Sequence, residues 1–131
     1  MSELLVYCPP GGKPPIYDFL TSLDEKLRIK LLTQLARLPS TPVSLMREPH
    51  IKHFTLERYS SLYEIREKNR VLVRVIFAIR GNGDILLLAP FIKRHKRNTM
   101  QALESSLKML AEIESDPRAA VNFRREEANI P

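Results

Sequence analysis

The sequence predicts an α+β domain in which a small antiparallel sheet is flanked by helices from both ends of the chain. Residues 59–67, 71–79 and 84–93 are rich in β-branched, aromatic and apolar side chains, and short turns separate them. Before and after these segments, apolar residues recur every three or four positions, which is the period of an amphipathic helix. The two patterns together predict a three-stranded meander between helices.

The N-terminal part is expected to hold one strand and a helical hairpin. Residues 4–8 are apolar-rich, and Pro9-Pro10-Gly11-Gly12 ends the strand because proline and glycine interrupt strand pairing. A second proline pair follows and suits the first turn of a helix. The leucine-rich stripe after it predicts helices over 14–22 and 24–38, with Ser22 or Asp24 capping the second.

The turns of the meander have the residues that hairpins prefer. Lys68-Asn69 separates the first two strands, and Gly81-Asn82-Gly83 separates the second from the third. A further short strand is expected over residues 52–56. With the N-terminal strand, these segments make up the predicted sheet.

The C-terminal part is expected to hold one helix and a tail. An apolar stripe predicts the helix over residues 99–114, with Thr99 as its cap. The following segment is polar, and we expect it to be loosely held or disordered. The chain is therefore divided into one domain, residues 1–115, and a tail, residues 116–131.

The charge balance points to polyanionic or acidic partners. The 131 residues include 21 Lys and Arg against 15 Asp and Glu, a net charge of +6 and a pI near 9.7. No apolar run approaches the roughly 20 residues of a membrane span, and the N-terminus lacks the pattern of a signal peptide. Cys8 is the only cysteine, so no internal disulfide is expected and a reducing cytoplasm suits the chain. The histidines lack ligand spacing and no glycine-rich phosphate loop is present, so no metal or cofactor is expected.

Arg74 is the first candidate functional residue. It lies in the central strand and shares a face with Leu72, Ile76 and Ala78, because side chains alternate along a strand. A guanidinium on an apolar face is costly unless it meets a carboxylate or an anion. If the hairpin register pairs Glu64 with Arg74, Arg66 lies beside them on the same face. A structural ion pair and a phosphate-binding role both remain open, and one does not exclude the other.

A basic run between the last strand and the last helix is the second candidate. Most such runs are solvated surface, but a helix N-terminus favours anions, which raises the expectation of phosphate contact here. Its residues are Lys93, Arg94, His95, Lys96 and Arg97.

Groups that could move a proton complete the candidate chemistry. Cleavage of RNA through the ribose 2′-hydroxyl needs a base, an acid and cations that stabilise the charged phosphorane. His50, His53, His95, Tyr59 and Tyr63 could carry the proton. A lone histidine is more often a surface residue than a catalyst, and His95 is favoured because it lies inside the basic run.

An ordered set of short motifs resembles the RelE/ParE superfamily, most closely its HigB-like, phage-derived branch. The motifs are Tyr17 to Lys26, Leu62-Tyr63-Glu64-Ile65-Arg66, Val73-Arg74-Val75-Ile76-Phe77, Ile85-Leu86-Leu87-Leu88 and Phe91-Ile92-Lys93-Arg94-His95-Lys96. The chain departs from the branch in having Arg97-Asn98-Thr99-Met100 where Thr-Pro is common, and in its longer tail.

The resemblance implies a toxin that cleaves messenger RNA in the ribosomal A site. It also implies a cognate antitoxin, which in this branch is often a helix-turn-helix protein. By the matching motif positions, Arg66, Arg74 and Lys93 would bind the scissile phosphate. Together with the basic run, this gives the full set of expected site residues. The catalytic set is Arg66, Arg74, Lys93 and His95, the RNA-binding set is Tyr63, Arg94, Lys96 and Arg97, and Tyr63 and Glu64 would orient the cations.

Two other functions are compatible with the same sequence, because a fold does not determine a function. One is a toxin of the ParE kind, which inhibits DNA gyrase without cutting RNA. The other is a catalytically inactive protein that keeps only its antitoxin-binding surface.

Overall fold

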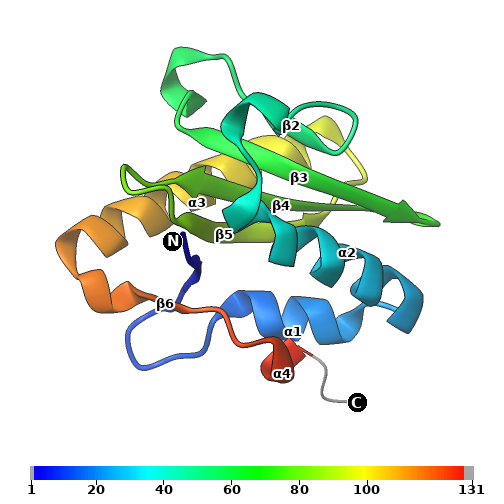
Figure 1. Ribbon diagram of the computed structural model, residues 1–131, viewed down its shortest axis with the longest axis horizontal. Coiled ribbons are helices and arrows are strands. Elements are labelled where there is room, and N and C mark those ends of the chain that lie inside the picture. Colours follow the sequence, from blue (N-terminus) through cyan, green and yellow to red (C-terminus); the bar gives the residue numbers. More distant parts are fainter. Residues whose placement is uncertain (1, 129–131) are drawn as a thin grey trace.

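The computed structural model describes residues 2–128 and has one sheet with helices on both faces (Figure 1). Within these residues the sheet has six strands in the order β2-β3-β4-β5-β1-β6. The strands are β1 (Leu4–Tyr7), β2 (Ile51–His53), β3 (Leu62–Asn69), β4 (Val71–Ile79), β5 (Ile85–Ile92) and β6 (Ala120–Asn122). The helices are α1 (Pro15–Ser22), α2 (Glu25–Arg37), α3 (Lys96–Ser115) and α4 (Arg125–Ala128).

The predicted meander is confirmed, but the sheet around it is larger and mixed. Strands β3, β4 and β5 pair antiparallel in sequence order. Strand β1 pairs parallel to β5, with Leu4 opposite Ile85, so the expectation of a purely antiparallel sheet is wrong. Alternation along a strand reports which residues share a face, but it contains no information on the direction of a neighbour distant in sequence.

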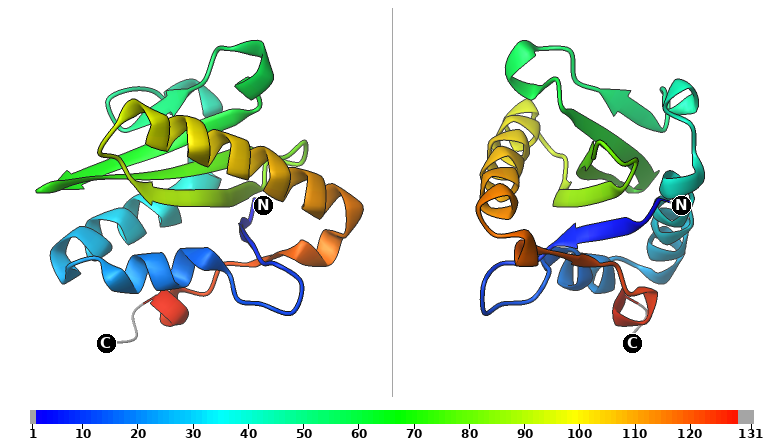
Figure 2. Two further views of the ribbon diagram at one scale, coloured as in Figure 1. Left: turned by 180° about the vertical axis from the view of Figure 1, so that it is seen from behind. Right: turned by 60° about the vertical axis from the view of Figure 1, so that its left-hand side comes forward.

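The two faces of the sheet carry separate apolar cores. Val73, Val75 and Phe77 of β4 belong to the core that includes α1 and α2, whereas Ile76 and Ala78 belong to the core under α3. Figure 2 shows α3 on one side of the sheet and α2 on the other. Each fully buried large apolar side chain contributes about 1.5–3 kcal/mol, so covering both faces stabilises the central strand strongly. Arg74 lies in this strand, which is covered on both faces.

The two N-terminal helices begin and end close to the predicted positions. Helix α1 begins at Pro15, and α2 begins after Asp24, whose carboxylate accepts a 2.9 Å hydrogen bond from the Leu27 N–H. The helices diverge from their connection, so that α1 contacts β5 and α2 contacts β3 (Figure 1).

Helix α3 begins earlier than predicted. Its first residue is Lys96 and its N-cap is His95, so Thr99 is not the cap. The side-chain oxygen of Asn98 accepts hydrogen bonds of 2.8 Å from the N–H groups of both Arg94 and His95. This amide therefore stabilises the turn that leads into the helix, a role the apolar stripe could not reveal.

The C-terminal segment differs from the expected loose tail as far as residue 128. Strand β6 pairs antiparallel with β1, and the ring of Phe123 lies 5.7 Å from that of Tyr17. Ala128 has no exposed surface and belongs to the core between the sheet and α1. Only a few apolar residues make these contacts, so the segment has no periodicity that sequence inspection would detect. The last part of the expected tail, residues 129–131, lies outside the described residues.

Candidate nucleic-acid interface

Arg74 lies on the α3 face of β4 and is 9% exposed. Its Nη1 donates a 3.0 Å hydrogen bond to the carbonyl of Val73, and its Nε is buried without a hydrogen-bond partner among the described residues. Burial lowers the pKa of Arg74, the carboxylate of Glu64 opposes this, and the nearby Arg66 guanidinium adds to it. The guanidinium is therefore held in place with part of its hydrogen-bonding capacity unused.

Glu64 connects Arg74 to Arg66. Its Oε1 lies 2.9 Å from Nε of Arg66 and 3.6 Å from Nε of Arg74, while its Oε2 is buried without a hydrogen bond among the described residues. Glu64 is 1% exposed, so its carboxylate needs cations nearby to offset the loss of water. Glu64, Arg66 and Arg74 taken together have a formal charge of +1.

The register places two cations directly opposite each other. Arg66 pairs with Arg74, and Glu64 pairs with Ile76, so the register considered from the sequence, with Glu64 opposite Arg74, is wrong by two residues. A two-residue shift keeps every side chain on its face, so Glu64 still reaches both arginines. Like charges directly across a strand pair are destabilising unless a counter-charge is present. The shared carboxylate supplies only part of that counter-charge.

Arg66 extends the cluster toward solvent. Its side chain is 23% exposed, and Nη1 lies 3.2 Å from a carboxylate oxygen of Glu48. Glu48 is largely exposed and precedes β2, and nothing in the sequence indicated that it would meet Arg66. This ion pair is open to solvent, so an incoming phosphate could replace it at little cost.

Lys93 lies at the other side of Arg74. Phe91 pairs with Arg74 across β4 and β5, and the N–H of Lys93 donates a 2.8 Å hydrogen bond to the carbonyl of Leu72. Alternation from Phe91 therefore puts Lys93 on the same face as Arg74. Arg66 of β3, Arg74 of β4 and Lys93, which directly follows β5, thus lie on one face of three neighbouring strands.

The rest of the basic run forms the turn from β5 into α3. Arg94, His95, Lys96 and Arg97 are exposed, and within residues 2–128 none of them forms an ion pair. The first turn of α3 contains no acidic residue, although acidic residues are favoured at that position. An anion bound at this turn would gain from both the side chains and the helix N-terminus.

Tyr63 lies on the opposite face of the sheet. Its ring stacks between those of His53 and Phe77, with centroids 4.3 Å and 5.3 Å away, and packs against the core that includes α2. The structure therefore does not bring Tyr63 together with Arg66 and Arg74. Tyr63 and Glu64 are adjacent in β3, so alternation alone already separates them.

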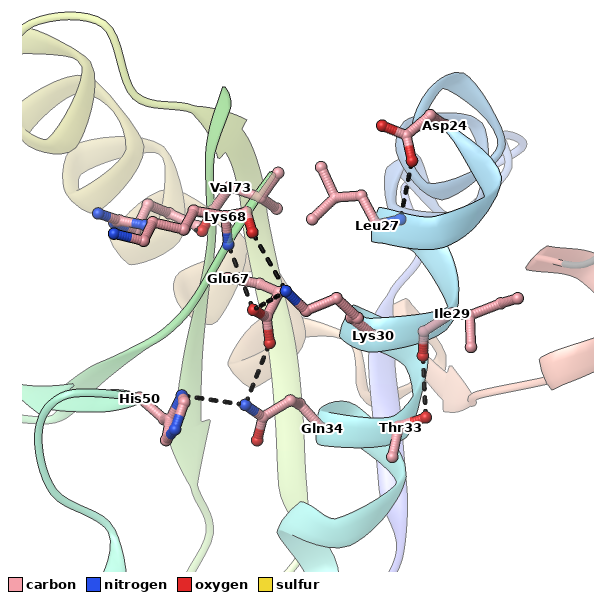
Figure 3. Close-up of polar contacts among 11 residues, drawn as sticks. Asp24, Leu27, Ile29, Lys30, Thr33, Gln34, His50, Glu67, Lys68 and Val73 are labelled. Atoms are coloured by element: carbon pink, nitrogen blue, oxygen red, sulfur yellow. Dashed lines mark hydrogen bonds and ion pairs between the residues drawn. The ribbon is translucent and has the colours of Figure 1, made fainter. Parts of the chain in front are cut away.

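The imidazoles of His50 and His53 also face away from the arginine cluster, although the carbonyl of His50 accepts a 2.8 Å hydrogen bond from the N–H of Arg66. Figure 3 shows His50 beside Gln34 of α2, whose amide lies 3.2 Å from both His50 Nδ1 and a carboxylate oxygen of Glu67. Lys30 pairs with the same carboxylate at 3.3 Å. Burial raises the pKa of Glu67, but the hydrogen bonds from Gln34 and Lys30 outweigh it, so the pKa is lowered. This network joins α2 to β3, and sequence inspection missed it because its members are distant in the chain.

The geometry can bind and polarise a phosphate group. Arg66, Arg74 and Lys93 present cations on one face, and the exposed basic turn adds further positive charge beside them. Arginine suits phosphate because its planar donors match phosphate oxygens in pairs. Among residues 2–128 no cluster of three or more His, Cys, Asp or Glu side chains could hold a metal ion. Over the same part of the chain, no helix combines the length and apolarity needed to cross a bilayer.

Residues 18–111 match the family model of phage-derived Gp49-like proteins (DUF891). The match covers most of the chain, including every strand from β2 to β5 and the basic turn. The protein therefore belongs to the Gp49-like family, which is one of the RelE/ParE-like toxin families. No curated protein matches the chain.

Proposed function

We propose that this protein is the toxin of a type II toxin–antitoxin system of the HigB-like branch, and that it arrests translation by cleaving mRNA on the ribosome. The observation that carries the proposal is the arginine pair Arg66 and Arg74, which shares one buried carboxylate oxygen and has unused donors. Family membership in a RelE/ParE-like group supports it. The protein would act in the cytoplasm, where translated mRNA is found.

The proposed role of each residue follows from its position in the structure. Arg66, Arg74 and Lys93 bind the scissile phosphate and stabilise the charge that develops on it. Arg94, Lys96 and Arg97 hold the neighbouring phosphates, which fixes the RNA without reading its sequence. His95 lies among these cations and transfers a proton, while Tyr63 acts only through the packing of β3, because it lies on the other face.

The proposed partner is a cognate antitoxin, a helix-turn-helix protein that blocks this face. The net charge of +6 favours an acidic partner segment, because opposite charge speeds association and sets orientation. Blocking need not involve contact with every catalytic residue, since a segment over the basic turn would already exclude RNA.

The decisive experiment is expression of the chain alone from a tightly controlled promoter, followed by mapping of mRNA 5′ ends. The test variant is Arg74→Ala, and the matched control is Arg58→Ala, which removes an exposed guanidinium bonded to Glu104 instead. We expect growth arrest with new cuts inside translated frames. Loss of one charge-stabilising donor should slow cleavage by about 10²–10³-fold in Arg74→Ala and leave the control active.

A variant that is inactive because it does not fold must be distinguished from one that is folded but does not cleave RNA. Thermal unfolding of the purified variants, together with Arg74→Lys, shows whether a silent variant is still folded. Arrest without new 5′ ends, accompanied by inhibition of supercoiling, would replace the proposal with the gyrase-inhibiting function. Harmless expression of the folded wild-type chain would leave only the antitoxin-binding function.

A further inference from the structure

A cavity of about 850 Å³ lies between α1, the start of α2 and the C-terminal segment. Its lining includes three cationic side chains, Lys13, Arg28 and Arg124, and two carboxylates, Asp18 and Glu127. None of the residues proposed for RNA cleavage lines it, so the cavity is separate from that site. Its volume is in the range of about 300–1,000 Å³ that is usual for small-molecule sites.

The charged groups of the cavity do not neutralise one another. Within residues 2–128, none of the five forms an ion pair. Arg28 is half-buried, its Nη1 donates a 3.3 Å hydrogen bond to the carbonyl of Leu23, and its Nε is buried without a partner in that part of the chain. A buried charged donor without a partner is costly, so an anion that reaches the Arg28 guanidinium would offset part of that cost.

The fold builds the wall of the cavity from two distant parts of the chain. Tyr17 and Asp18 come from α1, and the Tyr17 hydroxyl oxygen accepts a 2.8 Å hydrogen bond from the N–H of Arg124. The ring of Phe123 packs on Tyr17 at 5.7 Å. These contacts hold the C-terminal segment against α1, as Figures 1 and 2 show for α4 beside α1. The cavity is therefore a built feature of the described fold.

We infer that this cavity binds a small phosphorylated ligand that also carries hydroxyl groups, such as a sugar phosphate or a nucleoside monophosphate. The three cations suit the phosphate, and the guanidinium of Arg28 can pair its planar donors with phosphate oxygens. The two carboxylates would repel a bare anion but accept hydrogen bonds from hydroxyl groups. Mixed charge in one cavity thus selects for a ligand with both features.

The test uses the full chain and four probes: ribose 5-phosphate, adenosine monophosphate, inorganic phosphate and ribose. Isothermal titration calorimetry gives the affinity, and amide chemical shifts of the labelled protein locate the site. We expect saturable binding of one of the two organic phosphates, at least about tenfold tighter than inorganic phosphate or ribose. The comparison between ribose 5-phosphate and adenosine monophosphate shows whether a base adds affinity.

Variants locate the binding. Arg28→Gln removes one charged donor and should weaken binding at least about tenfold, whereas Arg118→Gln should not change it. Arg118 is a suitable control because it is exposed and pairs with Asp116 outside the cavity. If the Arg28→Gln variant does not fold, the Arg124→Gln variant is used in its place.

Three results would overturn the inference. The first is the absence of saturable binding by either organic phosphate. The second is binding that survives Arg28→Gln and Arg124→Gln but is lost when Arg94 and Arg97 are replaced by glutamine, which would place it at the basic turn. The third is equal affinity for inorganic phosphate, which would exclude the proposed ligand class. None of these results depends on whether the protein cleaves RNA.

Discussion

Two glutamates of this protein interact with arginine side chains in different ways. Glu104 of α3 accepts hydrogen bonds of 2.8 and 2.6 Å from Arg58 and a further one from the Tyr59 hydroxyl. Glu64 of β3 shares one oxygen between Arg66 and Arg74 and leaves the other without a partner among the described residues.

The surroundings of the two clusters differ as much as their bonding. In the first cluster the side chains of Arg58 and Glu104 are exposed and the carboxylate is fully bonded, and the cluster joins the segment before β3 to α3. In the second cluster Glu64 and Arg74 are buried and incompletely bonded, and Arg66 is partly exposed. Buried polar groups are normally satisfied, so an unsatisfied buried cluster calls for an explanation. The first cluster is structural, and the second is the one that we propose to bind phosphate.

The largest expected effect that separates the clusters is on stability. Glu64→Ala leaves two opposed guanidiniums without their buried counter-charge, and breaking a buried pair in this way costs about 3–5 kcal/mol. Glu104→Ala affects an exposed cluster and should cost much less. Urea unfolding of both variants measures the difference, and equal losses would contradict the distinction.

The same unfolding experiment is repeated with added phosphate. If the second cluster binds phosphate, added phosphate should raise the unfolding midpoint of the wild type and of Glu104→Ala. An Arg74→Gln variant should gain less from phosphate than either of them. Equal gains for all three proteins would show that the effect does not arise at Arg74.

A smaller effect is expected on the salt dependence of RNA binding through the basic turn. Replacing Arg94, Lys96 and Arg97 by glutamine would remove three of the proposed phosphate contacts. For single-stranded RNA this should reduce the slope of log affinity against log salt by about 2, at about 0.7 for each contact. A matched control replaces Lys26, Arg37 and Arg80, three exposed cations elsewhere. A similar reduction in the control would mean that binding follows net charge and has no defined site.

The smallest expected effect is the pH dependence of the Glu104 cluster. Hydrogen bonds from Arg58 and Tyr59 lower the pKa of Glu104 from 4.5 to about 2. The unfolded chain therefore takes up this proton at higher pH than the folded protein does, and the contribution of Glu104 is lost as the pH falls from about 4.5 to 2. The difference in melting temperature between wild type and Glu104→Gln should shrink over this range. A constant difference would contradict the assignment of this pKa.

Much of the fold around the site follows from local patterns. The composition of the central segments and the turns between them predicted the meander, and the alternation of side chains predicted the common face of Arg66, Arg74 and Glu64. The leucine spacing predicted α1 and α2 within one or two residues. The start of α3 was missed because the side-chain amide of Asn98 stabilises the turn before the helix. The predicted cap, Thr99, does not have this role.

The sequence by itself determined the three central strands, the two N-terminal helices and the face that each strand residue occupies, because these properties depend on neighbours in the chain. Only the tertiary structure decided that β1 lies parallel to β5 and that the C-terminal segment completes the core. It also decided that Arg66, rather than Glu64, lies opposite Arg74. These arrangements join residues far apart in sequence or turn on strand register. They are set by how whole faces pack and by which charges can share a buried counter-charge, and no local period carries that information.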